Sequence, residues 1–192
     1  MRELVYYVAV SLDGYIAGPD GQFDAFLFEG DHMDGINEQY SDTLPTHYAE
    51  MLGVTPRGDR FDTVLMGYGT YAAGLPDVTS PYRHLNQYVF THRHHEPVDG
   101  VTFTDRDPAE VVRELKDRDG LDIWLCGGGR LAAQLAGEID RFVLKRHPVL
   151  LGAGIPFVAP GTYAPRRFER ISAREFDSGV SFAEYAATQA RT

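Results

Sequence analysis

Short apolar runs alternate with polar, helix-forming segments along most of this chain. Leu4–Val10 is an unbroken apolar run without polar alternation, which is typical of a strand buried on both faces of a sheet. Similar runs, bounded by glycine, proline or charged residues, predict five more strands. They are expected at Phe61–Met66, Gln87–Thr91, Val101–Phe103, Leu121–Cys126 and Phe142–Leu144.

Helical patterns separate the predicted strands. One helix is expected near Asp34–Leu52 and a short one over Thr70–Ala73. Asp107 and Pro108 open a third, because aspartate is a favoured N-cap and proline fits the first helical position. The apolar face of this helix consists of Val111, Val112 and Leu115, and Gly120 is its stop signal. The next helix has an apolar face that consists of Leu131, Leu135 and Ala136.

The chain ends in a different pattern. Two alternating runs, Phe168–Phe176 and Val180–Ala186, flank the turn signal Asp177-Ser178-Gly179 and predict an antiparallel hairpin. The whole pattern indicates an α/β fold with a mostly parallel sheet and antiparallel strands at one edge. The aromatic residues of the hairpin would either pack across a homodimer interface or close the core; they are Phe168, Phe176, Phe182 and Tyr185.

Composition narrows the class of protein. The 192 residues, 43% of them hydrophobic, suit one domain over residues 1–192 with a substantial core. A net charge of −10 argues against nucleic-acid or membrane-surface partners, although a few local cations can still hold one phosphate. The single cysteine, Cys126, excludes an internal disulfide framework, so a cytoplasmic location is expected; its place on an apolar strand predicts a buried, inert thiol.

Glycines cluster directly after three predicted strands. They lie in Gly14–Gly21, in Met66-Gly67-Tyr68-Gly69-Thr70 and in Cys126-Gly127-Gly128-Gly129-Arg130. In open α/β sheets ligands bind at the carboxyl ends of strands, where glycines let the backbone approach a ligand and helix N-termini direct N–H groups at phosphate. The first loop also carries Tyr15 and Ile16, so we expect it to cover a ligand.

The triple glycine has two alternative interpretations. It can be a strand-to-helix turn without a ligand. Gly127, Gly129 and Ala132 also match the G-x-G-x-x-A pattern of Rossmann dehydrogenases. The acidic residue expected about twenty positions further on is missing, however, and Lys145 and Arg146 lie there instead.

His92-Arg93-His94-His95 follows the strand predicted at Gln87–Thr91. Neighbouring residues rarely point inward together, and no cysteine or carboxylate has ligand spacing to them, so no metal site is expected. The open interpretations are a solvated turn and an anion site formed by Thr91, His92 and Arg93.

Four of these segments together resemble the dihydrofolate reductase-like superfamily. The resemblance is greatest to the C-terminal reductase domain of bifunctional riboflavin biosynthesis deaminase-reductases and to its stand-alone relatives. The segments are Ser11-Leu12-Asp13-Gly14-Tyr15-Ile16-Ala17, Met66-Gly67-x-x-Thr70-Tyr71, Cys126-Gly127-Gly128-Gly129 and Pro148-Val149-Leu150-Leu151-Gly152-x-Gly154-Ile155-Pro156. The resemblance implies a single-domain fold with a central sheet of about eight strands, helices on both faces, and hydride transfer from NADPH.

Carried over by position, the resemblance implies a cofactor site along the strand ends. Ala9 and Ile16 would contact the nicotinamide, and the loop through Gly18 would cover it. The other cofactor residues are Gly67, Thr70, Gly127, Gly128, Gly129, Arg130 and Leu131 along the pyrophosphate, and Thr91, His92 and Arg93 facing the adenosine 2′-phosphate. Gly127-Gly128 is expected as a cis peptide. Tyr68 replaces a basic residue common in dihydrofolate reductases, so NADH stays an alternative cofactor.

The substrate side is expected to involve fewer residues. Asp13 is the acid nearest the proposed nicotinamide and is expected either to deliver a proton or to cap a turn. Asp24, Leu151 and Gly154 are the expected substrate contacts, with a simple chain reversal as the alternative for the last two.

The leading hypothesis is an NADPH-dependent reductase of a small heterocycle, such as 5-amino-6-(5-phosphoribosylamino)uracil. The alternatives are a nucleotide-binding or regulatory module without turnover, a dihydrofolate reductase, and a Rossmann-type dehydrogenase.

Overall fold

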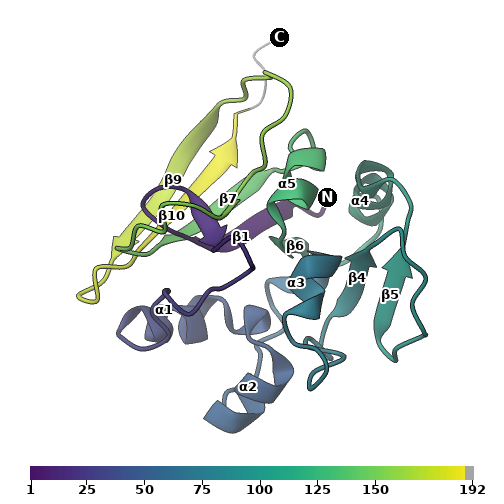
Figure 1. Cartoon of the computed structure of the whole chain (residues 1–192), viewed down its shortest axis with the longest axis horizontal. Helices are drawn as coiled ribbons and strands as arrows, with labels where there is room; N and C mark the ends of the chain where they lie inside the picture. Colours follow the sequence, from purple (N-terminus) through teal and green to yellow (C-terminus); the bar gives the residue numbers. More distant parts are fainter. Residues whose placement is uncertain (189–192) are drawn as a thin grey trace.

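A computed structural model describes residues 1–188. Most of its strands form one sheet: β1 (Leu4–Val10), β3 (Phe61–Gly67), β4 (Asn86–Phe90), β5 (Val101–Thr104), β6 (Asp122–Gly127), β7 (Arg141–Arg146), β9 (Phe168–Glu175) and β10 (Ser181–Ala187). Their order is β5-β4-β3-β6-β1-β7-β10-β9 (Figure 1). Pairing is parallel from β5 through β7 and antiparallel from β7 to β10 to β9. The predicted eight-stranded, mostly parallel sheet with a hairpin at one edge is confirmed.

Helices cover both faces of this sheet (Figure 1). The helices are α1 (His32–Gln39), the 3₁₀ helix η1 (Ser41–Thr43), α2 (Thr46–Leu52), α3 (Tyr68–Ala72), α4 (Pro108–Lys116) and α5 (Gly129–Gln134). Ile36 of α1 and Ala49 of α2 belong to the core on one face, and Val112 of α4 and Leu131 of α5 belong to the core on the other. None of the helices within residues 1–188 has the length and apolar character that a membrane crossing requires.

Strand β1 shows why its sequence lacks polar alternation. Leu4 and Tyr6 point into the core beneath α4 and α5, while Val5 and Tyr7 point into the core beneath α1 and α2. Because β1 pairs with β6 on one side and β7 on the other, both of its faces are buried.

The predicted continuous helix over Asp34–Leu52 is wrong. The structure breaks it after α1 and η1, at Leu44 and Pro45. Leu44 has extended backbone angles, as the clash with a following proline ring favours. The predicted cap of α4 is confirmed, since the Asp107 side chain accepts the N–H of Glu110 at 3.0 Å. That helix ends at Lys116, before the predicted stop at Gly120.

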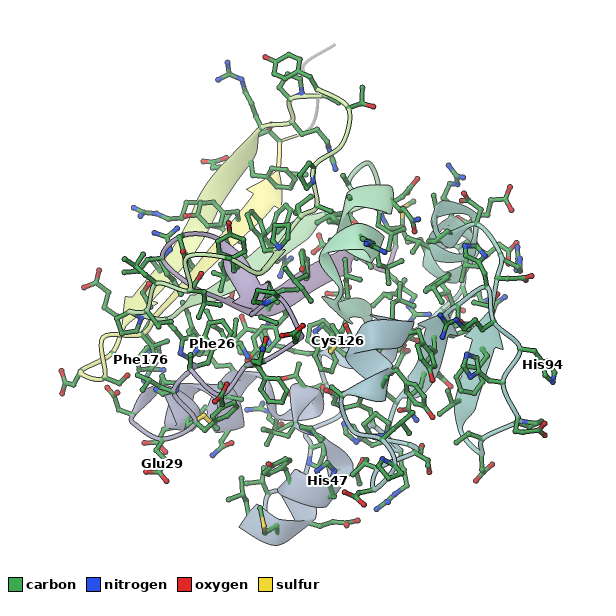
Figure 2. The ribbon with its side chains drawn as sticks, viewed as in Figure 1. Phe26, Glu29, His47, His94, Cys126 and Phe176 are labelled. Carbon is green, nitrogen blue, oxygen red and sulfur yellow. The ribbon has the colours of Figure 1, made fainter. Side chains whose placement is uncertain are left out.

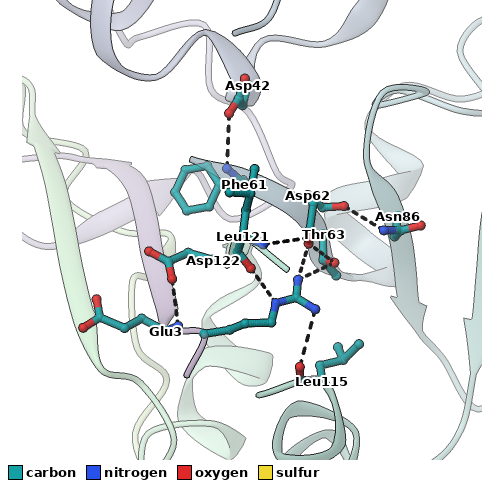
Figure 3. Close-up of polar contacts among 10 residues, drawn as sticks. Glu3, Asp42, Phe61, Asp62, Thr63, Asn86, Leu115, Leu121 and Asp122 are labelled. Atoms are coloured by element: carbon teal, nitrogen blue, oxygen red, sulfur yellow. Dashed lines mark hydrogen bonds and ion pairs between the residues drawn. The ribbon is translucent and has the colours of Figure 1, made fainter. Parts of the chain in front are cut away.

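Arg2 ties together the amino ends of three central strands, through contacts with Asp62, Thr63 and Leu121, which Figure 3 labels. Its buried guanidinium forms an ion pair with Asp62 and donates to the Thr63 hydroxyl at 2.8 Å and the Leu121 carbonyl. Asp62 also accepts the N–H of Leu121 at 2.8 Å. This network closes one end of the sheet, at the end opposite to the glycine turns.

Two short strands that the sequence did not predict pair with each other. They are β2 (Tyr15–Ala17) and β8 (Ile155–Pro156), which form a separate antiparallel sheet. The segments that hold them, predicted as a loop and a turn, are therefore partly strand. The two strands lie far apart in the sequence, so no local sequence pattern predicts that they pair.

The hairpin aromatics divide between core and surface. Phe176 and Phe182 are buried in the core and pack edge to face, with ring centroids 4.9 Å apart. Phe168 packs against Phe142 at 4.9 Å, and Tyr185 is half-buried. Phe176 and Phe182, the two aromatic residues near the hairpin turn, therefore close the core.

Candidate functional site

Two of the glycine turns meet at the carboxyl ends of neighbouring strands. Met66 of β3 is paired with Gly127 of β6. A Cβ atom placed on Gly127 or on Gly128 would lie 3.6 Å from the Thr70 hydroxyl oxygen of α3. Gly128 has φ = +102°, a backbone conformation that favours glycine. The structure therefore brings Gly67, Thr70, Gly127 and Gly128 together around one backbone surface.

The Gly127–Gly128 peptide is trans, so the expectation of a cis bond is wrong. The cis bond recorded within residues 1–188 precedes Pro76. Positive φ angles at both glycines, rather than peptide isomerisation, turn the chain from β6 into α5.

The third glycine of the triplet packs against the small sheet. A Cβ on Gly129 would lie only 2.0 Å from the Pro156 carbonyl oxygen, and the Gly129 carbonyl accepts the N–H of Ala159 at 2.9 Å. Gly154 is equally confined, since a Cβ there would lie 2.1 Å from the Ala17 carbonyl oxygen. These contacts fasten β2 and β8 over the triple-glycine turn.

Helix α5 begins within this turn. Its first-turn N–H groups have no acceptor within the helix, and they face the carboxyl end of the sheet, where a phosphate would be favoured. Arg130 is exposed, whereas Leu131 is buried in the core. Any ligand contact of Leu131 would therefore use its backbone.

The proposed nicotinamide residues lie on adjoining elements. Ala9 is half-buried near the end of β1, and Ile16 lies on β2 and packs against the core beneath α4 and α5. Gly18 follows β2, and its N–H donates to the Gln22 carbonyl at 2.7 Å, which closes a tight loop.

Asp13 is exposed and acts as a hydrogen-bond acceptor. Its carboxylate accepts from the Ser11 hydroxyl at 2.6 Å, from the Gly152 N–H at 2.7 Å and from the Leu151 N–H at 3.2 Å. The hydrogen bond from Ser11, with those from the two backbone N–H groups, lowers the pKa of Asp13. These contacts fit a residue that positions two loops, and a proton-donor role for Asp13 stays a prediction.

The histidine-rich turn follows β4, next to the Gly67 end of β3. His92 and Arg93 are exposed, and the Arg93 N–H donates to the Thr91 hydroxyl at 3.1 Å. His95 is held by Thr91 at 3.2 Å and stacks on Tyr68, with ring centroids 4.5 Å apart. Figure 2 shows His94 at the molecular surface. The side chains of His92 and Arg93 are therefore accessible to an anion at the end of β4.

The loop before α1 carries Asp24, which is exposed and unconnected to the glycine turns by any hydrogen bond within residues 1–188. Two contacts hold this loop. Phe26 packs edge to face on His147, with ring centroids 5.0 Å apart, and the Leu27 N–H donates to His147 Nδ1 at 3.2 Å. Burial, with a smaller effect of the Lys145 charge, lowers the pKa of His147 to about 4.

Sequence reasoning missed a group of side chains beneath the carboxyl end of β1. Lys145 of β7 is half-buried, with its Nζ 4.1 Å from the centre of the Tyr7 ring. Cys126 of β6, labelled in Figure 2, is half-buried, and burial raises its pKa to about 11, which supports the inert-thiol interpretation. The signal was a lysine two residues after the buried Val143, on the strand face that Val143 turns toward the core.

Two hollows on the described surface lie away from these residues. One is lined by parts of β4, β5 and α4, and the other by residues near α2 and the loop before β4. The candidate site is thus defined by backbone turns and side chains at the strand ends.

The sheet order, the hairpin and the glycine turns define an α/β protein of the dihydrofolate reductase-like superfamily. Residues 2–182 match the RibD C-terminal domain, and the chain belongs to this family. It is 36% identical over 160 residues to the uncharacterized protein YwjB of Bacillus subtilis (strain 168), with 81% of this chain and 82% of that protein covered. It is 28% identical over 193 residues to YyaP of the same organism, also uncharacterized, with 93% and 92% covered.

Solved structures share the fold at low sequence identity. A protein from Shewanella sp. PV-4, provisionally named as a riboflavin biosynthesis protein, superposes with a TM-score of 0.71 at 21% identity, covering 98% of this chain and all of that one. A Thermotoga maritima diaminohydroxyphosphoribosylaminopyrimidine deaminase/5-amino-6-(5-phosphoribosylamino)uracil reductase gives 0.66 at 16% identity. This chain is covered to 97% but spans only 57% of the bifunctional protein.

Proposed function

We propose that this protein is an NADPH-dependent reductase of a small heterocyclic substrate, most like a 5-amino-6-(5-phosphoribosylamino)uracil reductase. The observation that carries the proposal is the meeting of Gly67, Thr70 and the triple glycine at the carboxyl ends of β3 and β6, in a chain of the RibD C-terminal domain family. Gly128 has a positive φ that a side chain would strain, and no non-neighbouring atom of residues 1–188 lies closer than 3.6 Å to a Cβ placed on Gly127 or Gly128, so this part of the turn suits a ligand that needs direct backbone approach.

The residues fit a dinucleotide. The glycine turn and the α5 N–H groups would hold the pyrophosphate, Arg93 and His92 would face the 2′-phosphate, and Ala9 would lie along the nicotinamide. NADPH would supply the hydride. The protein would orient the two reactants and exclude water, with the β2–β8 sheet fixing the covering loop.

Ligand binding tests the proposal first. Saturating NADPH at about 100 times its Kd should stabilise the fold by about 2.7 kcal/mol. For a chain of this size, that corresponds to a rise in melting temperature of roughly 5–10 °C. No shift with millimolar NADPH or NADH would reject the reductase proposal.

Turnover tests it second. NADPH oxidation is followed by absorbance with 5-amino-6-(5-phosphoribosylamino)uracil, dihydrofolate and a panel of small cyclic imines and ketones. Oxidation with the uracil derivative supports the proposal, and oxidation with dihydrofolate alone would assign the protein to dihydrofolate reduction instead. Binding without oxidation of any of them would favour a nucleotide-binding module.

A further inference from the structure

One amine beneath the carboxyl end of β1 contacts an aromatic ring and no polar side chain of the described residues. Lys145 lies on β7, two residues after the buried Val143, so its side chain shares the core face beneath α1 and α2. Within residues 1–188 its ammonium group forms no hydrogen bond or ion pair with any side chain, and its protein contact is the face of the Tyr7 ring at 4.1 Å. An ammonium left in such a place is well suited to meet a polar group of a ligand.

A second unpartnered polar group belongs to the same contact. Tyr7 is 2% exposed, and its buried hydroxyl has no hydrogen-bond partner in the described part of the chain. The neighbouring Thr43 hydroxyl donates its proton to the Tyr40 carbonyl at 2.7 Å and not to Tyr7. Buried hydroxyls are normally satisfied, so this one also indicates a polar ligand atom.

The position of Lys145 relates it to the cofactor. Lys145 is the register partner of Ala9 on the adjacent parallel strand, so the two side chains lie on the same face of the sheet. Ala9 is the residue expected along the nicotinamide. The amine therefore lies beside the place where hydride would leave the cofactor.

We propose that Lys145 is a catalytic residue, the proton donor of the reduction, and that the substrate carries a C=N or C=O bond whose heteroatom lies at its ammonium group. This inference rests on the proposed reductase function. Hydride from the dihydronicotinamide adds to the carbon, and the π electron pair moves to the nitrogen or oxygen. That atom takes the proton from Lys145 Nζ, and the neutral amine regains a proton from solvent.

Two titratable neighbours of Lys145 are uncharged near neutral pH. Burial raises the pKa of Cys126, on β6, to about 11 and lowers that of His147, directly after β7, to about 4, so both side chains are neutral near pH 7. Burial lowers the pKa of Lys145 to about 8, which suits a general acid.

Two further elements face the same cluster. Tyr40, which follows α1, stacks on Tyr7 with ring centroids 4.5 Å apart and donates to Glu184 of β10. Arg60 lies 4.4 Å above the Tyr40 ring. The Glu184 carboxylate is thus engaged by a hydroxyl and is not the counter-ion of Lys145.

Kinetics of three variants separate proton donation from simple charge. Lys145→Met keeps the apolar packing on Tyr7, Lys145→Arg keeps the charge but not a proton that can leave near neutral pH, and Arg146→Met removes the exposed neighbouring cation as the matched control. With a substrate that the wild type reduces, kcat should fall about 100- to 10,000-fold in both Lys145 variants and stay within about twofold in the control.

The pH profile and cofactor binding complete this test. The wild-type kcat should decline above about pH 8 as the amine loses its proton, and Lys145→Met should lack this decline. NADPH affinity should change less than about threefold in every variant. Recovery of activity by Lys145→Arg, or an unchanged pH profile in Lys145→Met, would show that Lys145 contributes only charge or packing and would overturn the proposal.

A measurement on the wild-type protein needs neither turnover nor a variant. The chain has two lysines. Acetic anhydride labelling followed by mass spectrometry therefore compares the labelling rate of Lys145 with that of Lys116, whose ammonium group forms an ion pair with Asp140 at 2.6 Å. Saturating NADPH should slow labelling of Lys145 at least fivefold and leave Lys116 unchanged. Thermal stabilisation by NADPH without protection of Lys145 overturns the proton-donor role alone. Absence of both effects rejects the reductase function, and the proton-donor role with it.

Discussion

The Asp13 carboxylate accepts the backbone N–H of Gly152 at 2.7 Å, joining two loops that are 139 residues apart in the chain. One loop follows β1 and carries β2, and the other precedes β8. The same carboxylate accepts the Ser11 hydroxyl at 2.6 Å. The most conspicuous acid of the first motif therefore links the two segments that form the small sheet.

Replacement of Asp13 distinguishes a positioning role from proton transfer. Asp13→Asn keeps one acceptor oxygen but loses the charge, and Asp13→Ala loses both. We expect weaker NADPH binding, by about threefold for Asn and about tenfold for Ala, because backbone N–H groups of the second loop lose an acceptor. Both should keep the shape of the wild-type pH profile of kcat.

The lowered pKa of Asp13 fixes the sign of its pH dependence. The folded pKa lies below the unfolded value, so the contribution of Asp13 is present above the unfolded pKa and is lost as pH falls through the folded one. The Asp13→Ala effect on NADPH affinity should therefore be constant from pH 6 to 8. A change in the acid or basic limb of the kcat profile would instead assign proton transfer to Asp13.

Gly129 provides a test of the triple-glycine turn. In Gly129→Ala the new methyl would lie 2.0 Å from the Pro156 carbonyl oxygen, so backbone on one side must move. We expect a loss of about 2 kcal/mol or more in the free energy of unfolding and a further loss of NADPH affinity. Gly137→Ala is the matched control, because nothing lies within 4 Å of its Cβ position. Equal unfolding curves for the two variants would contradict the close approach of β8 to this turn.

The sheet could be predicted because its signals are local. Leu4–Val10 is apolar throughout because both faces of β1 are buried, and Asp177-Ser178-Gly179 marks a hairpin whose strands are neighbours in sequence. The helix expected over Asp34–Leu52 failed because the apolar pattern continued across Pro45, whose effect on Leu44 outweighed that pattern.

The site was predicted less completely because its contacts are long-range. The glycine turns were visible in the sequence, but the pairing of Tyr15 with Pro156 and the stacking of Lys145 on Tyr7 depend on how distant strands are ordered. A lysine on an inward-facing strand position is the kind of local inconsistency that marks a functional group. It becomes informative only once β7 is known to lie beside β1.

Arg93 tests the expected preference for the phosphorylated cofactor. Its side chain is exposed beside Thr91 at the end of β4, and a guanidinium contact to a phosphate is worth about 1.5–3 kcal/mol. Arg93→Ala should weaken NADPH about 10- to 100-fold and NADH less than about twofold, as measured by thermal titration. Arg83→Ala, which removes an exposed arginine paired with Glu50, should change neither. Equal losses for both cofactors would place the 2′-phosphate elsewhere.

His147 makes the fold sensitive to acid. Burial holds its folded pKa at about 4, below the value of about 6.5 expected in an unfolded chain, so protons bind the unfolded state more readily. The contribution is fully present above about pH 7 and is lost as pH falls from 6.5 towards 4. Its size is on the order of 3–4 kcal/mol at most.

The substitution His147→Gln isolates this effect. Glutamine retains an acceptor for the Leu27 N–H but does not titrate, so the free energy of unfolding should fall less steeply between pH 6.5 and 4.5 than in the wild type. Urea unfolding at several pH values measures both slopes, and carboxylates contribute equally to each. His94→Gln, at an exposed position, should retain the wild-type slope. If His147→Gln and the wild type decline in parallel, the acid sensitivity arises outside this contact, and the loop carrying Phe26 is held independently of the charge on His147.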